Sequence, residues 1–313
     1  MPIIDPNALD NCDVGNILPQ IFARQDDPLK KTLTGWKRLD KFLNGGFEVP
    51  SFAILGAEPK AGKSRWAQLV AEHHVENGGV AYYLDEENGR QRVWGHSLAS
   101  KAELGTGKLT ALLSKEEHER RQKARDWAMK MKGRFYYDDT RTIRTPEEFR
   151  GRIAQVRERA GSAPLFVVCD SLQKLPVDLA NRRAGIDKWL REIEAIRDEN
   201  KCVILALSEL TRPDSKLGEI GYGTARGVRF KESGDAEYTA DISLLMTKIR
   251  PGGKPNWDDP TAKWTGPDYN MVIDYNRDGA AGNVASYCMV FQHYGMVEGD
   301  FIETLRKKKE DDE

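Results

Sequence analysis

The chain has 313 residues, of which 39% are hydrophobic, so it can bury one sizeable core. Its 48 Lys and Arg residues nearly balance its 49 Asp and Glu residues, and the net charge of −1 excludes a uniformly basic nucleic-acid-binding protein. A DNA-binding surface would have to be a local patch or a channel lining. No apolar run approaches the roughly 20 residues of a membrane-spanning helix, so we expect no membrane association.

The four cysteines, Cys12, Cys169, Cys202 and Cys288, are widely scattered and form no CxxC pair. This spacing predicts neither a zinc site nor a redox motif. The first residues are acidic and punctuated by proline, unlike a signal peptide. Together these features predict a reducing, cytoplasmic setting.

Three regions follow from the composition along the chain. Residues 1–31 are polar and predict an N-terminal arm or linker, with a short amphipathic helix over residues 14–23. This arm is either a frayed terminus or a segment that docks on a neighbouring subunit. Residues 32–300 predict one domain, and residues 301–313 form a solvated charged tail.

The hydrophobic periodicity predicts alternating helices and strands in the central domain. Helices are predicted over residues 36–43, 65–76, 90–132 with a Gly-rich break at 105–107, 146–159 and 186–199. Strands are predicted over residues 51–55, 80–84, 135–137, 165–169, 202–207, 242–246, 269–274 and 284–291. Fully apolar strands that alternate with helices predict an α/β fold with a mostly parallel sheet. The close spacing of the strands after residue 240 predicts an antiparallel C-terminal extension.

Two polar segments interrupt the later strands. Residues 211–235 are Gly-rich and predict a loop. Residues 251–268 predict a long insertion that carries Trp257 and Trp264. These tryptophans either stack on bases or, as is more common for such side chains, cover a local apolar patch or an interface.

Residues 56–64 (GAEPKAGKS) form a phosphate-binding loop, because they follow a predicted strand and precede a predicted helix. Successive backbone N–H groups and the helix N-terminus make an anion cradle there. Gly62 allows close approach, Lys63 brings a positive charge to the β- and γ-phosphates, and the Ser64 hydroxyl can bind magnesium. The predicted ligands are therefore ATP and Mg²⁺. We expect nucleotide contacts from Ala57, Glu58, Pro59, Lys60, Ala61, Gly62, Lys63, Ser64 and Arg65.

Acidic residues follow two other predicted strands. Asp170 ends the strand over residues 165–169 and is predicted to hold the metal through water, although a helix N-cap or turn is the alternative. Asp85, Glu86 and Glu87 follow the strand over residues 80–84, at the strand end where ligands gather in open α/β sheets. We predict that Glu86 orients the attacking water, and that Asp85 and Glu87 are solvated loop acids.

From about residue 32 to 291 the chain resembles the RecA-like ATPase domain of DnaB-type replicative helicases, in helicase superfamily 4. The resemblance lies in residues 34–40 (TGWKRLD), 44–46 (NGG), 56–64, 84–87 (LDEE), 168–173 (VCDSLQ), 207–212 (LSELTR), 231–241 (KESGDAEYTAD) and 274–279 (DYNRDG) with Gly282. It implies a RecA-like P-loop NTPase fold, a Walker A motif and a Walker B Asp170. It also implies a catalytic Glu86, a buried acid at Asp241 and an arginine finger at Arg277. RecA- and KaiC-like ATPases share the first three motifs but fit the last two less well.

The chain departs from this family's pattern in three places. Glu209 stands where the family usually has a Gln that couples the γ-phosphate to DNA contacts. Tyr275 stands where the family often has a Lys, two residues before the finger arginine. No helicase N-terminal domain or primase precedes the motor in this sequence, so loader and primase docking by the usual route is not expected.

An arginine finger acts from outside its own nucleotide site, so Arg277 acting in trans implies a ring or a filament. The resemblance implies a homo-oligomer, a hexamer, whose central loops face single-stranded DNA. Basic side chains on flexible loops suit phosphate contacts without base readout, and solvated loop charges are the alternative. The predicted DNA contacts are Lys174, Arg182, Arg183, Arg212, Arg226, Arg229 and Lys231.

The function predicted first is an ATPase that drives a ring-forming helicase or translocase on single-stranded DNA, in a phage or mobile-element replication module. The second is a RecA- or KaiC-like recombination or repair ATPase that binds DNA without unwinding it. The third is a regulatory ATPase that switches a protein assembly and ignores DNA. Because backbone contacts do not distinguish the sugars, RNA is a further possible strand.

Overall fold

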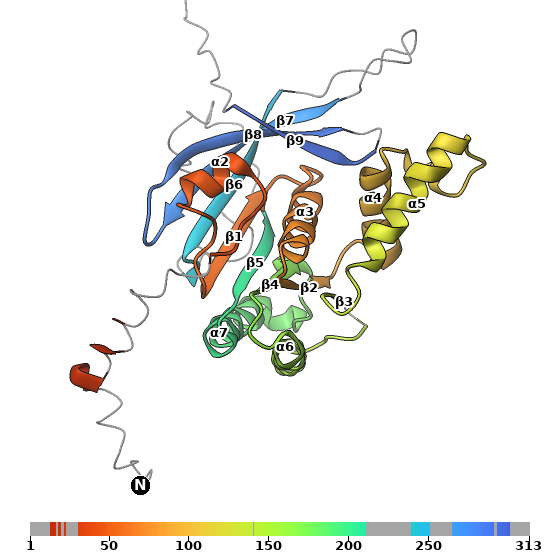
Figure 1. Cartoon of the computed structure of the whole chain (residues 1–313). Helices are drawn as coiled ribbons and strands as arrows, with labels where there is room; N and C mark the ends of the chain where they lie inside the picture. The colour runs from red at the N-terminus through yellow and green to blue at the C-terminus, as the bar shows by residue number, and fades with distance from the viewer. Residues whose placement is uncertain are drawn as a thin grey trace, which may run out of the picture.

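The computed structural model describes residues 13–16, 18–19, 22, 31–139, 141–210, 239–250, 265–290 and 293–300. Its centre is a sheet in the order β3-β2-β4-β5-β1-β6-β7-β8-β9 (Figure 1). The strands are β1 (Ser51–Ala57), β2 (Val80–Asp85), β3 (Phe135–Asp139), β4 (Leu165–Asp170), β5 (Val203–Glu209), β6 (Ile242–Arg250), β7 (Thr265–Asn276), β8 (Gly282–Val290) and β9 (Gly295–Gly299).

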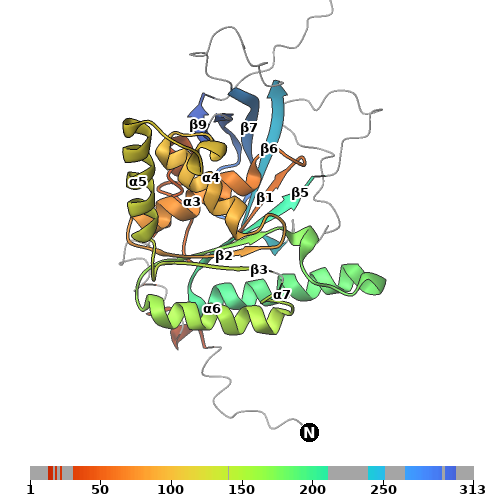
Figure 2. The same ribbon diagram turned by 90° about the vertical axis from the view of Figure 1, so that its right-hand side faces the viewer.

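Helices cover both faces of this sheet. Figure 2 shows α6 and α7 along one face, with α3, α4 and α5 on the other side. The helices are α2 (Lys37–Phe42), α3 (Lys63–Glu76), α4 (Arg90–Ala102), α5 (Lys115–Met129), α6 (Pro146–Ala160) and α7 (Arg182–Asn200). Short 3-10 helices are η2 (Thr106–Leu109), η3 (Leu172–Lys174) and η4 (Leu179–Asn181).

The central strands are buried on both faces, as their apolar sequences predict. Along β1, Phe52 and Ile54 pack into the core beneath α6 and α7, whereas Ala53 and Leu55 pack into the core beneath α3. Successive side chains of a strand point to opposite faces, so one buried strand contributes to two cores. This explains why β1 shows no polar alternation.

The sheet is parallel from β3 to β6 and antiparallel from β6 to β9. The predicted fold class, a mostly parallel sheet with an antiparallel C-terminal extension, is confirmed. β9 was not predicted, because its sequence GMVEG has two glycines and little β propensity. β7 begins at Thr265, so the predicted insertion over residues 251–268 was wrong in its last four residues.

Several boundaries differ from the predictions for local reasons. The predicted helix over residues 90–132 is divided into α4 and α5 with η2 between them. α5 starts at a capping box in which the Ser114 and Glu117 side chains accept each other's backbone N–H. α7 begins at Arg182, four residues earlier than predicted.

Some predictions lie outside the described residues. These are the charged tail over residues 301–313, the loop over residues 211–235, both insertion tryptophans and most of the N-terminal arm. Within the arm, residues 14–16, 18–19 and 22 are helical, and the Val14, Leu18 and Phe22 side chains are exposed. In the described part of the chain, none of the helices has the length and apolar character that a membrane crossing requires.

Candidate active site

The phosphate-binding loop connects β1 to α3, as the sequence predicts. Gly62 caps α3 with φ +91°, in the left-handed region that favours glycine. A Cβ atom at Gly62 would lie 2.8 Å from the Met289 Cε atom. The backbone angle therefore favours glycine here, and any larger residue would also have to displace the flexible Met289 side chain. Lys63 and Ser64 then begin the helix, so their backbone N–H groups lie at its N-terminus.

A cavity of about 400 Å³ opens beside this loop. Its volume lies in the range typical of small-ligand sites. Besides Arg65, whose guanidinium is paired with Glu72, three cationic side chains and one acidic side chain line it, a balance that favours an anionic ligand. The lining residues are Lys60, Gly62, Lys63, Ser64, Arg65, Gln68, Glu87, Asn88, Arg92, Val93, His96, Met289 and Tyr294.

Asp170 lies at the same edge of the sheet, because the parallel strands all end there. It pairs in register with Asp85 and is fully buried. Its Oδ2 atom accepts a hydrogen bond of 2.8 Å from the Tyr83 hydroxyl, while its Oδ1 atom is buried with no hydrogen-bond partner. Burial raises the pKa of Asp170 to about 6, although the Ser64 and Tyr83 hydroxyls favour the charged form.

Glu86 follows β2 and contacts the Asp170 strand end directly. Its backbone N–H donates to the Asp170 carbonyl oxygen at 2.6 Å. Both carboxylate oxygens are buried without a hydrogen-bond partner. Burial, and then the nearby charges of Asp85 and Asp139, raise the pKa of Glu86 to about 8. A carboxyl with that pKa is mostly protonated at pH 7, and in its ionised form its two uncommitted oxygens can accept a proton.

Asp85 is not the solvated loop acid that the sequence predicts. It is only 2% exposed, and its carboxylate accepts backbone N–H groups from Glu87, Asn88 and Gly89. The Tyr137 hydroxyl also donates to it. Asp85 therefore fixes the turn that carries Glu86, and its contact with Tyr137 forms only when β2 pairs with β3. Glu87 is exposed, as predicted.

The residues present fit a magnesium site. The donor set is a hydroxyl on Ser64 and a carboxylate on Asp170, whose buried Oδ1 atom has no other partner. Hard oxygen donors are those that Mg²⁺ prefers, and one or two protein ligands plus substrate phosphates are its usual arrangement. Among the described residues, no group of three or more His, Cys, Asp or Glu side chains could hold a metal alone.

The Arg65 side chain is directed into the protein. Its guanidinium pairs with Glu72 at 3.1 Å and donates to the Ser97 hydroxyl and, at 2.9 Å, to the Tyr294 carbonyl oxygen. One nitrogen, Nη2, is buried without a partner. Arg65 thus ties α3 to α4 and to the turn before β9, and its contact with nucleotide stays a prediction.

Sequence reasoning missed two aromatic residues of the cavity. The rings of His96 and Tyr294 stack with their centroids 3.8 Å apart. Burial, and then the charges of Arg65 and Arg92, lower the pKa of His96 to about 4, so the ring is neutral at pH 7. Neither residue belongs to a motif, and Tyr294 lies on the turn before the unpredicted β9.

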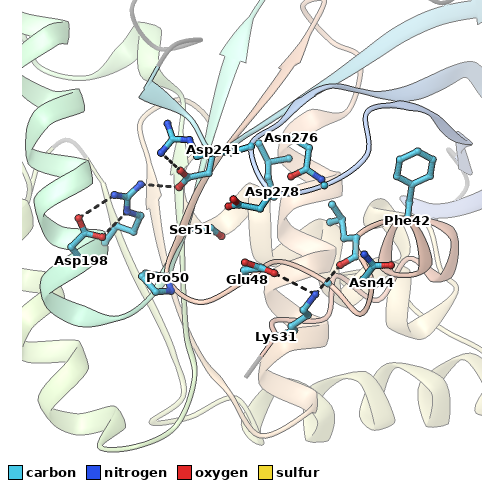
Figure 3. A pocket seen from close by; sticks show the side chains of 16 residues that line it. Lys31, Phe42, Asn44, Glu48, Pro50, Ser51, Asp198, Asp241, Asn276 and Asp278 are labelled. Atoms are coloured by element: carbon cyan, nitrogen blue, oxygen red, sulfur yellow. Dashed lines mark hydrogen bonds and ion pairs between the residues drawn. The ribbon is translucent and has the colours of Figure 1, made fainter. Parts of the chain in front are cut away.

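Arg277 lies at the opposite end of the sheet from the phosphate-binding loop. Its guanidinium pairs with Asp241 at 2.8 Å, and Arg197 pairs with the other oxygen of the same carboxylate (Figure 3). Asp241 also accepts the backbone N–H of Phe52, near the start of β1. From Phe52 to the end of β1 is five residue steps of about 3.3 Å, or roughly 17 Å.

This end carries a separate cavity of about 190 Å³, which Figure 3 shows from close by. Asp198, Asp278 and Glu48 line it beside Asp241. Arg277 is 47% exposed there. The structure therefore does not bring Arg277 to the chain's own phosphate-binding loop.

Three of the predicted DNA contacts follow β4: Lys174 on η3, and Arg182 and Arg183 at the start of α7. Lys174 and Arg183 are exposed, whereas Arg182 donates to the Gln173 carbonyl oxygen at 2.6 Å. The Gln173 side chain donates to Ser208 and accepts the backbone N–H of Glu209, so it joins the ends of β4 and β5. The other predicted contacts, Arg212, Arg226, Arg229 and Lys231, lie outside the described residues.

The chain is similar in sequence to curated replicative helicases. The "Replicative DNA helicase DnaB" of Haemophilus influenzae is 26% identical over 258 residues, covering 80% of this chain and 52% of the relative. The "Replicative DNA helicase DnaC" of Bacillus subtilis is 26% identical over 286 residues, covering 86% of this chain and 56% of the relative. The chain thus spans about half the length of the curated relatives it matches.

Solved structures share the fold. One that is described as an ATPase domain superposes with a TM-score of 0.72 at 19% identity, covering 94% of this chain and 99% of the other. A DnaB-like replicative helicase studied with primase gives a TM-score of 0.73 at 19% identity, covering 92% and 69%. A KaiC-like protein from Pyrococcus horikoshii gives 0.55 at 16% identity, covering 87% and 99%. The family model of the DnaB-like helicase C-terminal domain matches residues 32–294, and the chain belongs to that family.

Proposed function

We propose that this chain binds and hydrolyses ATP with magnesium, as the motor of a ring-forming helicase or translocase on single-stranded DNA. The observation that carries the proposal is the meeting of three groups at one sheet edge: the phosphate-binding loop, the buried Asp170 and the unpartnered Glu86. Membership of the DnaB-like helicase C-terminal domain family supports it. So do the curated relatives, which are replicative DNA helicases.

In the proposed reaction, the backbone N–H groups at the start of α3 and the buried Lys63 hold the triphosphate. The cation would be held by Ser64 and, through water, by Asp170, and it would neutralise charge on the phosphate oxygens. Glu86 orients the attacking water and accepts its proton. Its pKa of about 8 lies close to the working pH, and only the ionised fraction of Glu86 acts as the base.

The proposed working unit is a closed homo-oligomer, a hexamer, in which Arg277 acts on the neighbour's nucleotide. The support is that Arg277 lies at the opposite end of the sheet from its own phosphate-binding loop. An arginine that stabilises transition-state charge must come close to the γ-phosphate. Its partner nucleotide must then belong to another chain.

The proposed DNA path runs along the loop after β4. Lys174 on this loop and Arg183 at the start of α7 are exposed cations, and Gln173 connects the loop to β5 beside the site. Contacts of this kind read phosphates and not bases. The setting that we propose is a phage or mobile-element replication module, which the identity of neighbouring replication genes would test.

The decisive experiment measures ATP hydrolysis with and without single-stranded DNA, for the wild type, Glu86→Gln and Arg277→Ala, together with the sedimentation state. We expect DNA-stimulated hydrolysis in a closed oligomer. Glu86→Gln should retain nucleotide binding but lose hydrolysis by about 100-fold or more. Arg277→Ala should assemble and hydrolyse ATP at least about 1,000-fold more slowly.

The other outcomes identify the alternatives. Hydrolysis that DNA does not change would contradict the helicase proposal and favour a nucleotide-switched assembly ATPase. DNA-stimulated hydrolysis without strand displacement would favour a RecA- or KaiC-like recombination ATPase. A parallel arm with single-stranded RNA tests which nucleic acid stimulates the enzyme.

A further inference from the structure

The Tyr83 hydroxyl touches both residues that the proposed function assigns to the metal. It donates to the Asp170 Oδ2 atom at 2.8 Å and lies 3.4 Å from the Ser64 carbonyl oxygen. A phenol has one proton to donate, so the shorter contact to Asp170 is the hydrogen bond that it makes. The Tyr83 side chain is fully buried.

This hydrogen bond makes the two carboxylate oxygens of Asp170 unequal. Oδ2 is occupied by Tyr83, whereas Oδ1 is buried and has no hydrogen-bond partner. A carboxylate that is held at one oxygen cannot rotate freely. The other oxygen is left available as an acceptor in one fixed orientation.

Tyr83 is itself held in place by its neighbours. Its ring stacks on the ring of Tyr137, its register partner on β3, with centroids 6.1 Å apart and an interplanar angle of 8°. The Tyr137 hydroxyl donates to Asp85, whose carboxylate caps the turn that carries Glu86. The two stacked tyrosines thus support the strand ends that carry Asp170 and Glu86.

We propose that Tyr83 is a positioning residue for the magnesium site, whose hydroxyl orients the Asp170 carboxylate so that Oδ1 is free for the cation's hydration shell. This inference rests on the proposed metal role of Asp170. Residues that orient a metal ligand typically change metal affinity by 10- to 100-fold when they are removed. They do so without touching the metal.

The preceding residue on β2 provides a matched control. Tyr82 is also fully buried, and its hydroxyl donates to a carboxylate, Asp138, at 3.0 Å. Asp138 pairs with Arg152 beneath the other face of the sheet. Tyr82→Phe and Tyr83→Phe therefore delete the same atom from adjacent, buried, carboxylate-bound tyrosines. Of the two, Tyr83 is the one that contacts the proposed metal site.

The test measures Mn²⁺ binding by electron paramagnetic resonance, in the presence of ADP, for the full chain. The proteins are the wild type, Tyr83→Phe, Tyr82→Phe, Asp170→Asn and the Tyr83→Phe/Asp170→Asn double variant. We expect Tyr83→Phe to weaken Mn²⁺ binding by roughly 10-fold or more. Tyr82→Phe should bind Mn²⁺ as the wild type does, and both variants should bind a fluorescent ADP equally well in EDTA. In the Asp170→Asn background, Tyr83→Phe should cause no further loss.

Thermal unfolding confirms that the variants are folded, and phenylalanine keeps the ring that stacks on Tyr137. Wild-type Mn²⁺ affinity in folded Tyr83→Phe, or an equal loss in Tyr82→Phe, would overturn the inference. If Asp170→Asn weakens Mn²⁺ binding and Tyr83→Phe does not, the inference fails and the proposed function stands. If Asp170→Asn itself binds Mn²⁺ normally, the metal role of Asp170 in the proposed function fails, and the Tyr83 inference fails with it.

Discussion

At the scale of single residues, Glu86 is costly to ionise in the folded chain. Its pKa is about 8 in the folded protein against an ordinary value of 4.5, because burial and the charges of Asp85 and Asp139 disfavour the carboxylate. Below pH 4.5 the group is neutral in both the folded and unfolded states. Between pH 4.5 and 8 only the unfolded state loses the proton, so stability falls as the pH rises.

We therefore expect Glu86→Gln to be more stable than the wild type by an amount that grows as the pH rises from 4.5 to 8. The amide stays neutral throughout, so this variant escapes the loss. Melting temperatures of both proteins across about pH 5–9, without metal or nucleotide, measure the difference. The raised pKa of Asp170 acts in both proteins and cancels. A difference that is constant across this range would contradict the raised pKa.

The ion pair between Arg65 and Glu72 provides a second test at this scale. Both side chains are buried, with 5% and 2% exposure. Breaking a buried pair from one side leaves an uncompensated charge, so Glu72→Gln should lower the free energy of unfolding by about 3–5 kcal/mol. The pair of Lys188 and Glu147 is 61% and 62% exposed and screened by solvent, so Lys188→Ala should leave the free energy of unfolding nearly unchanged. Urea unfolding measures both values, and equal losses would contradict the expectation.

At the scale of elements, Gln173 connects two strands that end at the site. Its amide donates to the Ser208 hydroxyl at 2.7 Å and accepts the Glu209 N–H at 3.0 Å. The residue after it, Lys174, is an exposed cation on the loop that we propose meets DNA. Gln173 therefore links the proposed DNA loop to β5, whose Glu209 replaces the glutamine usual in the family.

We expect Gln173→Ala to reduce the stimulation of hydrolysis by DNA while the DNA-independent rate changes little. The variant removes the side-chain hydrogen bonds from η3 to Ser208 and Glu209 of β5, but no group that contacts phosphate or metal. Hydrolysis rates measured across a range of single-stranded DNA concentrations test this. Lys174→Ala is the companion variant, and it should weaken the apparent affinity for DNA and leave the maximal stimulation intact. Normal stimulation in Gln173→Ala would exclude the link.

The order of the elements followed from the sequence. Short, fully apolar runs indicate buried strands, whereas apolar residues spaced three or four apart indicate amphipathic helices. The fold class and the strand–loop–helix context of residues 56–64 needed no more than that. The sequence did not predict β9, whose two glycines give it little β propensity. This strand is stabilised by pairing with the edge of β8.

The site was only partly predictable, for a related reason. Motif spacing placed Lys63, Ser64, Glu86 and Asp170 at one edge of a parallel sheet. It could not distinguish the buried Asp85 from the exposed Glu87, because the difference depends on turn geometry and on Tyr137. Tyr83 looked like a core residue of an apolar strand. Its hydroxyl has a partner only because β2 and β4 pair in register.

At the scale of the whole molecule, the chain carries its phosphate-binding loop and Arg277 at opposite ends of one sheet. The proposed function makes each nucleotide site a joint product of two chains. A chain that lacks the Glu86 carboxylate can then still supply Arg277 to the nucleotide site of its neighbour. Complementation between two variants therefore tests whether the site is shared between chains.

We expect a mixture of Glu86→Gln and Arg277→Ala chains to regain activity that neither variant has alone. The Arg277→Ala chain keeps an intact phosphate-binding half, and an adjacent Glu86→Gln chain supplies an intact arginine. Random mixing at equal amounts should restore about a quarter of the sites. Hydrolysis is measured after the subunits are mixed and reassembled. An inactive mixture, with mixed oligomers verified by mass spectrometry, would contradict action in trans.

The distance between these two ends has a consequence for the unassembled chain. Arg277 is held by Asp241 at the far end of β1. In an isolated subunit, the Arg277 guanidinium therefore lies far from the phosphates of an ATP bound at the phosphate-binding loop. Under the proposed function, such a subunit would bind nucleotide and remain idle. ATP hydrolysis would then begin only when subunits assemble, so that unassembled subunits in the cell would not consume ATP.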